Sequence, residues 1–439
     1  MYHVKNSAFW LAVILTFALQ GSSFSQAFIT TWQTDNSGPS DDDQITIPTF
    51  SGETYNYDIE WGDGMSDTGV TGDITHTYAS PGTYTVSITG IFPRIYFDAG
   101  GFFGSDTDHD KILTIQQWGS ISWTSMASAF SGCVNLRINA SDSPDLSGVT
   151  DMSEMFLEAE SLNDNIDNWD VSTIITMRSL FEDAVVFNQP LNSWDVSNVT
   201  NMAEMFSDAE VFNQPLHSWN VSSVTTMEEM FFFARAFNQD LSTWVVDNVE
   251  NMADMFTRSQ FDQDISGWNV SNVTNLDGTF QSTPFNQDIS GWNVSSVTIM
   301  RNLFRGAESF NQDISGWNVS SVTNMFGMFS GAILFDQDLS GWDVDQVNNM
   351  SIMFSEANAF TGDITGWDVS GATYLSGMFQ NNTTFNQDIS GWTVSGVSNM
   401  ENMFSGATAF NVDISSWVVD NVDDMSGMFS GASSFNQDI

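Results

Sequence analysis

From Trp169 onward a tryptophan returns every 24 or 25 residues, and this period constrains the fold more than any other feature of the chain. A fixed period of this length is typical of a solenoid, in which each unit is one supersecondary element that buries its apolar side against its neighbours. The sequence therefore predicts tandem repeats over residues 144–439. The anchors are Trp169, Trp194, Trp219, Trp244, Trp268, Trp292, Trp317, Trp342, Trp367, Trp392 and Trp417.

Within each unit the apolar residues follow a helical spacing. Met325, Met328, Phe329 and Ala332 lie at i, i+3, i+4 and i+7, which is one face of an amphipathic helix of about two turns. Residues 338–344 alternate in polarity and predict a short strand. Strands repeated at one period would form a parallel sheet with coils about 4.8 Å apart. An all-strand parallel β-helix is the alternative, because the units are rich in Val and Thr, but the Met-Phe-Ala spacing favours one helix per coil.

Residues 1–27 predict a secretory signal peptide, with a basic start at Lys5, an apolar run over residues 8–19 and a small polar end. An apolar run of about twelve residues is too short to span a bilayer as a helix, and no longer run follows, so the mature chain is expected to lack a transmembrane segment. Cys133 is the only cysteine and cannot form an intramolecular disulfide. The stability of the fold must therefore come from packing.

Residues 28–92 differ in character from the repeats, because short β-branched or aromatic runs alternate with turn residues. Two motifs stand out, Trp61-Gly62-Asp63-Gly64 and the stretch His76-Thr77-Tyr78-Ala79-Ser80-Pro81-Gly82. Together they resemble the PKD domain of surface and secreted proteins. The resemblance implies a small immunoglobulin-like β-sandwich over these residues.

Residues 93–143 are predicted to form the N-terminal cap of the solenoid and its first repeat, since an array must cover its open end. Ala129-Phe130, Cys133, Leu136 and Ile138 resemble the BspA-type leucine-rich repeat. The later units, such as residues 286–295, resemble BspA-family surface proteins, including the mycoplasma-type surface repeat. The resemblance implies a bacterial cell-surface or secreted protein that mediates adhesion or protein interaction. The predicted fold class is a PKD-like β-sandwich followed by a leucine-rich-repeat-like α/β solenoid with a parallel sheet.

The charge balance excludes some partners. Nine basic residues face 55 acidic ones, giving a formal net charge of −46. Nucleic acid is excluded because phosphate binding needs a basic surface, and docking on anionic lipid is disfavoured for the same reason. The charge is expected to keep a long array soluble and monomeric. The remaining candidate ligands are an extracellular protein or a glycan.

One column of acids is the candidate binding site, because it occupies the same position in nine consecutive units. Carboxylates stacked at the spacing of successive coils repel one another, so something must relieve them. One hypothesis is calcium, bound by Asp288, Asp313, Asp338, Asp363 and Asp388. The other is that each carboxylate accepts hydrogen bonds at a turn, which the Asp-Ile-Ser context permits. The whole column is Asp240, Asp264, Asp288, Asp313, Asp338, Asp363, Asp388, Asp413 and Asp438.

No catalytic residues are predicted, and the chain is not expected to be an enzyme. No unit differs from its siblings by gaining a nucleophile, a base and an orienting group together. His76 is interpreted as a hydrogen-bonded structural residue, and Cys133 as a small core residue. The acidic loop at residues 106–110 has a spacing that suits a cation, but it lacks the glycine that such loops use.

Three functional hypotheses follow: an adhesion or interaction module, a rigid stalk, and a carbohydrate-targeting appendage of a secreted system. Exposed tryptophans on the array would favour glycan or protein binding, whereas buried tryptophans would favour the stalk. The sequence stops at Ile439, inside a unit, so a C-terminal cap and any surface anchor are expected beyond it.

Overall fold

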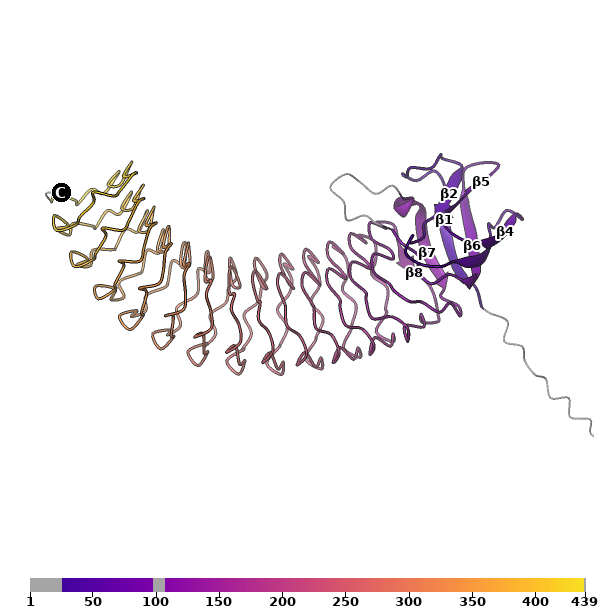
Figure 1. Cartoon of the computed structure of the whole chain (residues 1–439), viewed down its shortest axis with the longest axis horizontal. Helices are drawn as coiled ribbons and strands as arrows, with labels where there is room; N and C mark the ends of the chain where they lie inside the picture. The colour runs from indigo at the N-terminus through magenta and orange to yellow at the C-terminus, as the bar shows by residue number, and fades with distance from the viewer. Residues whose placement is uncertain (1–25, 98–106, 438–439) are drawn as a thin grey trace, which may run out of the picture.

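The computed structural model describes residues 26–97 and 107–437. Figure 1 shows two β-sheets at one end and a long, curved stack of coils that runs from them to the C-terminus. Within the described residues, no helix has the length and apolar character needed to cross a membrane. Most of the predicted signal peptide, residue 106 of the acidic loop and Asp438 of the acid column lie outside the described residues.

The N-terminal end contains all the named strands of the described chain. Six strands form one sheet in the order β4-β3-β6-β1-β7-β8, and β2 pairs with β5 in a second sheet. Every pair is antiparallel except β7 with β8. The strands are β1 Phe28–Gln33, β2 Gln44–Ile47, β3 Asn56–Glu60, β4 Ser66–Val70, β5 Ile74–Thr77, β6 Thr83–Ile91, β7 Ile112–Gln117 and β8 Arg137–Ile138, with one short 3-10 helix, η1, at His109–Lys111.

The larger sheet continues into the start of the array. β1 pairs with β6 on one side and with β7 on the other, so a strand from beyond residue 92 lies inside this sheet. The prediction of a self-contained immunoglobulin-like sandwich is therefore wrong. Phe28 contacts Trp118 and Trp123, and Trp118 contacts Trp169 of the repeats, with ring centroids 5.8, 5.2 and 5.3 Å apart. This aromatic cluster joins the sheet to the first coils without a break in the core.

The predicted helix is absent from the repeats, although its apolar face is buried. Residues 325–332 form successive turns, in which Gly327 and Gly331 have φ of +63° and +72°. An α-helix requires φ near −60°, so two left-handed residues four apart exclude it. The i, i+3, i+4 and i+7 spacing survives because three-residue turns also bring every third or fourth side chain to the core.

Hydrogen bonds from alternate backbone amides join each coil to the next. The amides of Met325, Gly327, Phe329 and Gly331 donate to carbonyls of the following coil, at 2.8 to 2.9 Å, and the intervening amides of Met328, Ser330 and Ala332 donate to carbonyls three residues back. The amide of Phe326 donates to Asn324 Oδ1. Every amide of this segment thus has a partner, as buried backbone requires. We call this segment and its equivalents in the other units the backbone ladder.

The predicted parallel sheet is also wrong. Successive coils share one isolated parallel bridge each, such as Asn324 with Asn349, rather than a ladder of paired strand residues. Residues 338–344, predicted to be a strand, form a turn in which the amide of Trp342 donates to the carbonyl of Leu339 at 3.0 Å. The predicted α/β solenoid is thus replaced by a stack of turns, which Figure 1 shows as coils without helices or arrows.

Three aromatic columns fill the core and report the curvature of the array. In the first column, the ring centroids of Phe329 and Phe354 lie 5.6 Å apart. In the second column, those of Phe335 and Phe360 lie 6.0 Å apart. In the tryptophan column, those of Trp342 and Trp367 lie 6.4 Å apart. The hydrogen-bonded ladder requires a spacing of about 4.8 Å. Because the separation grows from the ladder to the tryptophans, the ladder lies on the inside of the bend that Figure 1 shows.

Gly331→Ala tests the ladder against the helix. In the ladder, a side chain at φ +72° costs about 1 kcal/mol, although a Cβ there meets only ordinary contacts from Gly306. In a helix the same change would stabilise by about 1 kcal/mol. We expect a lower midpoint of chemical denaturation.

Gly316→Ala is the matched control in the same unit, because its Cβ would meet open space and its φ is not positive. We expect no loss of stability there. A Gly331→Ala protein that is more stable than the parent would contradict the ladder.

Candidate functional site

The acid column lies on exposed turns, and each described member accepts the amide two residues further on. Asp288 Oδ1 accepts the amide of Ser290 at 2.9 Å, and Asp363 Oδ1 accepts both the amide and the hydroxyl of Thr365. Hydrogen bonds from Ser290 hold the pKa of Asp288 below its usual value. The same turn occurs at Asp240, Asp264, Asp313, Asp338, Asp388 and Asp413.

Each described carboxylate of the column thus has the local hydrogen-bond donor that the sequence offered as the alternative to calcium. Asp388 and Asp413 line one shallow hollow together with Ser390 and Ser415, so neighbouring members of the column are brought to the same surface. In the described part of the chain, no group of three or more His, Cys, Asp or Glu side chains is arranged to hold a metal ion. The acids therefore act as turn-forming side chains, and calcium binding by Asp288, Asp313, Asp338, Asp363 and Asp388 stays a prediction.

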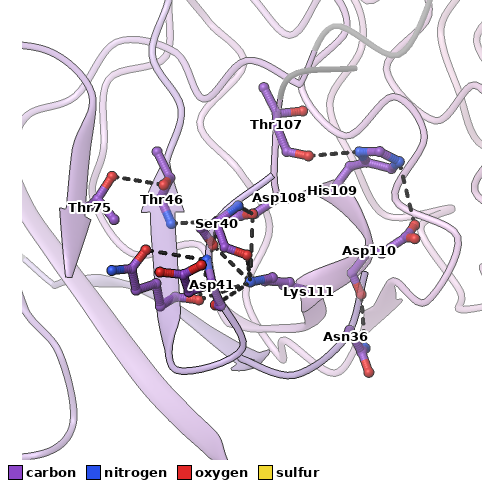
Figure 2. Close-up of polar contacts among 11 residues, drawn as sticks. Asn36, Ser40, Asp41, Thr46, Thr75, Thr107, Asp108, His109, Asp110 and Lys111 are labelled. Carbon is purple, nitrogen blue, oxygen red and sulfur yellow. Dashed lines mark hydrogen bonds and ion pairs between the residues drawn. The ribbon is translucent and has the colours of Figure 1, made fainter. Parts of the chain in front are cut away.

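The second candidate, the acidic loop before β7, is occupied by an ion pair. Asp108 and Lys111 are fully buried, with Lys111 Nζ 3.8 Å from Asp108 Oδ1. Figure 2 shows both side chains converging on Ser40 and its neighbours. Asp108 Oδ2 accepts the Ser40 hydroxyl and the Thr46 amide, each at 2.7 Å. The amine of Lys111 donates to the carbonyls of Ser40 and Asp41 at 3.0 Å.

Each charge in this buried pair is therefore matched by hydrogen bonds, as burial of charges requires. Figure 2 also places His109 apart from that pair: its Nδ1 lies 3.0 Å from the Thr107 carbonyl, and its Nε2 lies 3.5 Å from Asp110. The cluster fastens the loop before β2 to η1. Because the amine of Lys111 already lies beside the Asp108 carboxylate, the cluster stabilises the loop and does not have the arrangement of a cation site.

His76 and Cys133 are also structural. His76 Nε2 lies 3.0 Å from Asp63 Oδ2, and its ring stacks on Trp61 at 4.7 Å. That hydrogen bond lowers the pKa of Asp63. Burial raises the pKa of the Cys133 thiol well above its usual value, so the reactive thiolate is disfavoured.

The tryptophans that anchor the units are core residues. Trp317 is 3% exposed, and its Nε1 donates to the carbonyl of Ile289 in the preceding unit at 3.2 Å. The same bond recurs from Trp194 to Trp417, where exposure reaches 9%. Because the anchor indoles are at most 9% exposed, the column offers almost no aromatic surface to a glycan or a protein.

The backbone ladder carries a group of charges that sequence reasoning missed. Arg178 bridges Glu154 and Glu204 of the two flanking units, at 2.7 and 3.0 Å. Burial, followed by the charges of Glu204 and Asp183, raises the pKa of Glu182 to about 7. Burial, followed by the charges of Asp208, Glu158 and Glu160, raises the pKa of Asp183 to about 6.

A comparison of the units would have located these residues. At the ladder positions between the core residues, one unit has Arg301 and Arg305, and others have Glu, Asp, Ser or Phe, whereas the core Trp and Phe positions do not change. The ladder is therefore one of the surfaces on which the units differ from one another.

These features define a tandem-repeat protein whose units are stacked turns with an aromatic core. The family described as "Mycoplasma protein of unknown function, DUF285" matches residues 124–234, 215–298, 279–374 and 362–439. These matches cover more than half of the chain, and the chain belongs to this family. No curated protein and no solved structure matches it.

Removal of calcium tests the acid column. We expect the full chain to melt at the same midpoint in excess calcium and in excess chelator, because the carboxylates already accept hydrogen bonds. A ligand that binds only the folded state raises the midpoint. A reproducible rise in calcium would favour the metal hypothesis instead.

Glu182→Gln tests the crowded carboxylates of the ladder. Because the pKa of Glu182 is about 7 in the folded chain and 4.5 ordinarily, the folded state holds its proton to higher pH. Ionisation of Glu182 therefore lowers the stability of the parent as pH rises from about 4.5 to about 7, and the variant lacks this one contribution while it keeps that of Asp183. After discounting for solvent screening, we expect the variant to be more stable by about 1 kcal/mol at about pH 8 and equal at about pH 4.

Asp313→Asn is the matched control for this series. Hydrogen bonds from Ser315 lower the pKa of Asp313, so its carboxylate stays ionised across this range and its effect on stability should not change between about pH 5 and about pH 8. Parallel stability profiles for Glu182→Gln and the parent would contradict the raised pKa.

Proposed function

We propose that this chain is a non-catalytic surface or secreted protein in which the repeat array serves as a rigid spacer. The observation that carries this proposal is the burial of every anchor tryptophan, each bonded to or packed against the neighbouring coil. The aromatic residues lie in the core, where they hold successive units in register and are not available to contact a ligand. Such an array sets a distance between the structures at its two ends.

The stiffness of the spacer rests on contacts that repeat without interruption. Phe329 stacks on Phe354 of the next unit and on Phe304 of the preceding one, at 5.6 and 5.8 Å. Five backbone hydrogen bonds join the coils of Phe329 and Phe354. In an array of this kind each unit contacts only its neighbours, so length follows the number of units.

Export is the second part of the proposal. Residues 1–27 have the pattern of a signal peptide, and the units resemble those of BspA-family surface proteins. The large negative charge suits an array that must stay dispersed outside the cell.

Adhesion through the ladder is a second candidate, favoured by one exposed cluster. Phe232 and Phe233 are only partly buried, and the guanidinium groups of Arg258 and Arg235 lie 4.6 and 5.6 Å from the Phe233 ring. Aromatic and Arg side chains dominate binding hot spots. Because no other unit has an aromatic residue at these positions, a partner that recognises the Phe pair would bind these coils alone.

Two deletions of whole units separate the two functions. One variant lacks residues 317–366 and the other lacks residues 219–267, which include the Phe232 cluster. Small-angle scattering should show both particles shortened by about 11 Å, since two coils at the mid-core spacing of Phe329 and Phe354 are removed. Both deletions keep the core columns in register and should leave the melting midpoint nearly unchanged.

Capture of extracellular-matrix proteins by the full chain and by both variants provides the second measurement. A spacer predicts equal behaviour of the two deletions. If the full chain and the first variant capture the same protein while the second does not, the ladder is a binding surface and the spacer proposal fails.

A further inference from the structure

Four of the anchor tryptophans are followed directly by an Asn-Val-Ser triplet. Asn318-Val319-Ser320 forms a turn in which Asn318 Oδ1 accepts the amide of Ser320 at 3.2 Å and its hydroxyl at 2.8 Å. Asn293, Asn269 and Asn220 make the same amide contact at 3.2, 3.3 and 3.2 Å. All four asparagines are exposed, and Asn269, Asn293 and Asn318 belong to consecutive units.

The fold itself does not require asparagine at this position. Asp368 occupies it in another unit, and its Oδ1 accepts the amide of Ser370 at 3.0 Å. The turn therefore needs only the side-chain oxygen. What Asn318 adds is the amide nitrogen Nδ2, which has no hydrogen-bond partner within residues 26–97 and 107–437.

Two Asn-Val-Thr triplets that begin four residues after an anchor tryptophan differ in this respect. Asn198 Nδ2 donates to the carbonyl of Ser172 at 2.8 Å, and Asn272 Nδ2 donates to the carbonyl of Asp247 at 2.7 Å. Each of these bonds holds the nitrogen against the neighbouring coil, so a sugar on the nitrogen would strain or break the bond. The structure thus separates the Asn-Val-Ser triplets with an open amide from these Asn-Val-Thr triplets with an occupied one.

The open amides lie where the coils are farthest apart. Each directly follows a tryptophan of the outer column, and Trp292 and Trp317 are 6.5 Å apart between centroids, against about 4.8 Å at the ladder. Bulky groups on consecutive units have the most room on this convex side.

We propose that Asn220, Asn269, Asn293 and Asn318 are acceptors for N-linked glycans. The triplet Asn-x-Ser/Thr with a residue other than Pro in the middle is the acceptor pattern for this modification. Nδ2 attacks the anomeric carbon of a sugar carried on a diphosphate donor. The N–C bond forms, the C–O bond to the diphosphate breaks, the diphosphate leaves with the electron pair, and one Nδ2 proton passes to a base of the transferase. A glycan row would cover the convex side of the spacer and leave the ladder open.

This inference rests on the proposed export of the chain, and one preparation tests both. The full chain is isolated from the cells that produce it and from their medium, and its peptides are mapped by mass spectrometry before and after treatment with peptide-N-glycosidase. We expect glycans at Asn220, Asn269, Asn293 and Asn318 and none at Asn198 or Asn272. Asn318→Asp keeps the turn and should lose one glycan without a change in melting midpoint, whereas Asn272→Asp should lose none.

The possible failures are distinguishable. An extracellular chain that is unmodified at all four asparagines overturns the acceptor proposal and leaves export standing. Glycans on Asn198 or Asn272 at equal occupancy overturn the argument from the open amide. A chain found only inside the cells overturns the proposed export, and the same peptide map then decides whether the asparagines are modified.

Discussion

The hydrogen-bonded backbone ladder between coils is the interaction on which the rest of the structure depends. Left-handed residues such as Gly327 and Gly331 turn alternate amides out of their own coil and toward carbonyls of the next. This pattern satisfies the backbone without a helix or a sheet. It also sets the closest spacing between units, from which the positions of the core columns and the curvature follow.

Curvature places unlike chemistry on the two sides of the array. On the inner side, burial, followed by the charges of neighbouring carboxylates, raises the pKa values of Glu182 and Asp183 to about 7 and about 6. On the outer side, the coils spread and the turns after the tryptophans are exposed, which leaves Asn318 Nδ2 open. The carboxylates of the acid column are not crowded in the way that Glu182 and Asp183 are, because Asp288 and its equivalents each accept a local amide.

The distribution of aromatic residues connects this architecture to function. Trp317 and its equivalents bond the backbone of the preceding unit, so they stabilise the stack rather than contact a ligand. The Phe232 cluster is the exception on the ladder, and it is confined to two adjacent units, since Arg258 of the next unit lies over the Phe233 ring. The cores of the units differ very little, which is consistent with a spacer. The Phe232 cluster is then either a single binding patch on that spacer or a patch without a function.

The sequence by itself determined the period, the buried face of each unit and the burial of Cys133, because a 25-residue repeat with Phe at one position can bury its apolar side only against itself. It also allowed the hydrogen-bonded role of the aspartates to be named as an alternative. The backbone conformation was decided only by the tertiary structure. The spacing of Met325, Met328, Phe329 and Ala332 is shared by a helix and by a run of three-residue turns, and the choice between them depends on hydrogen bonds to the next coil that no local pattern encodes. Gly, Asn or Asp recurring four residues apart was the available signal, but Glu154 and Ile352 adopt the same left-handed geometry, so residue type alone does not reveal it.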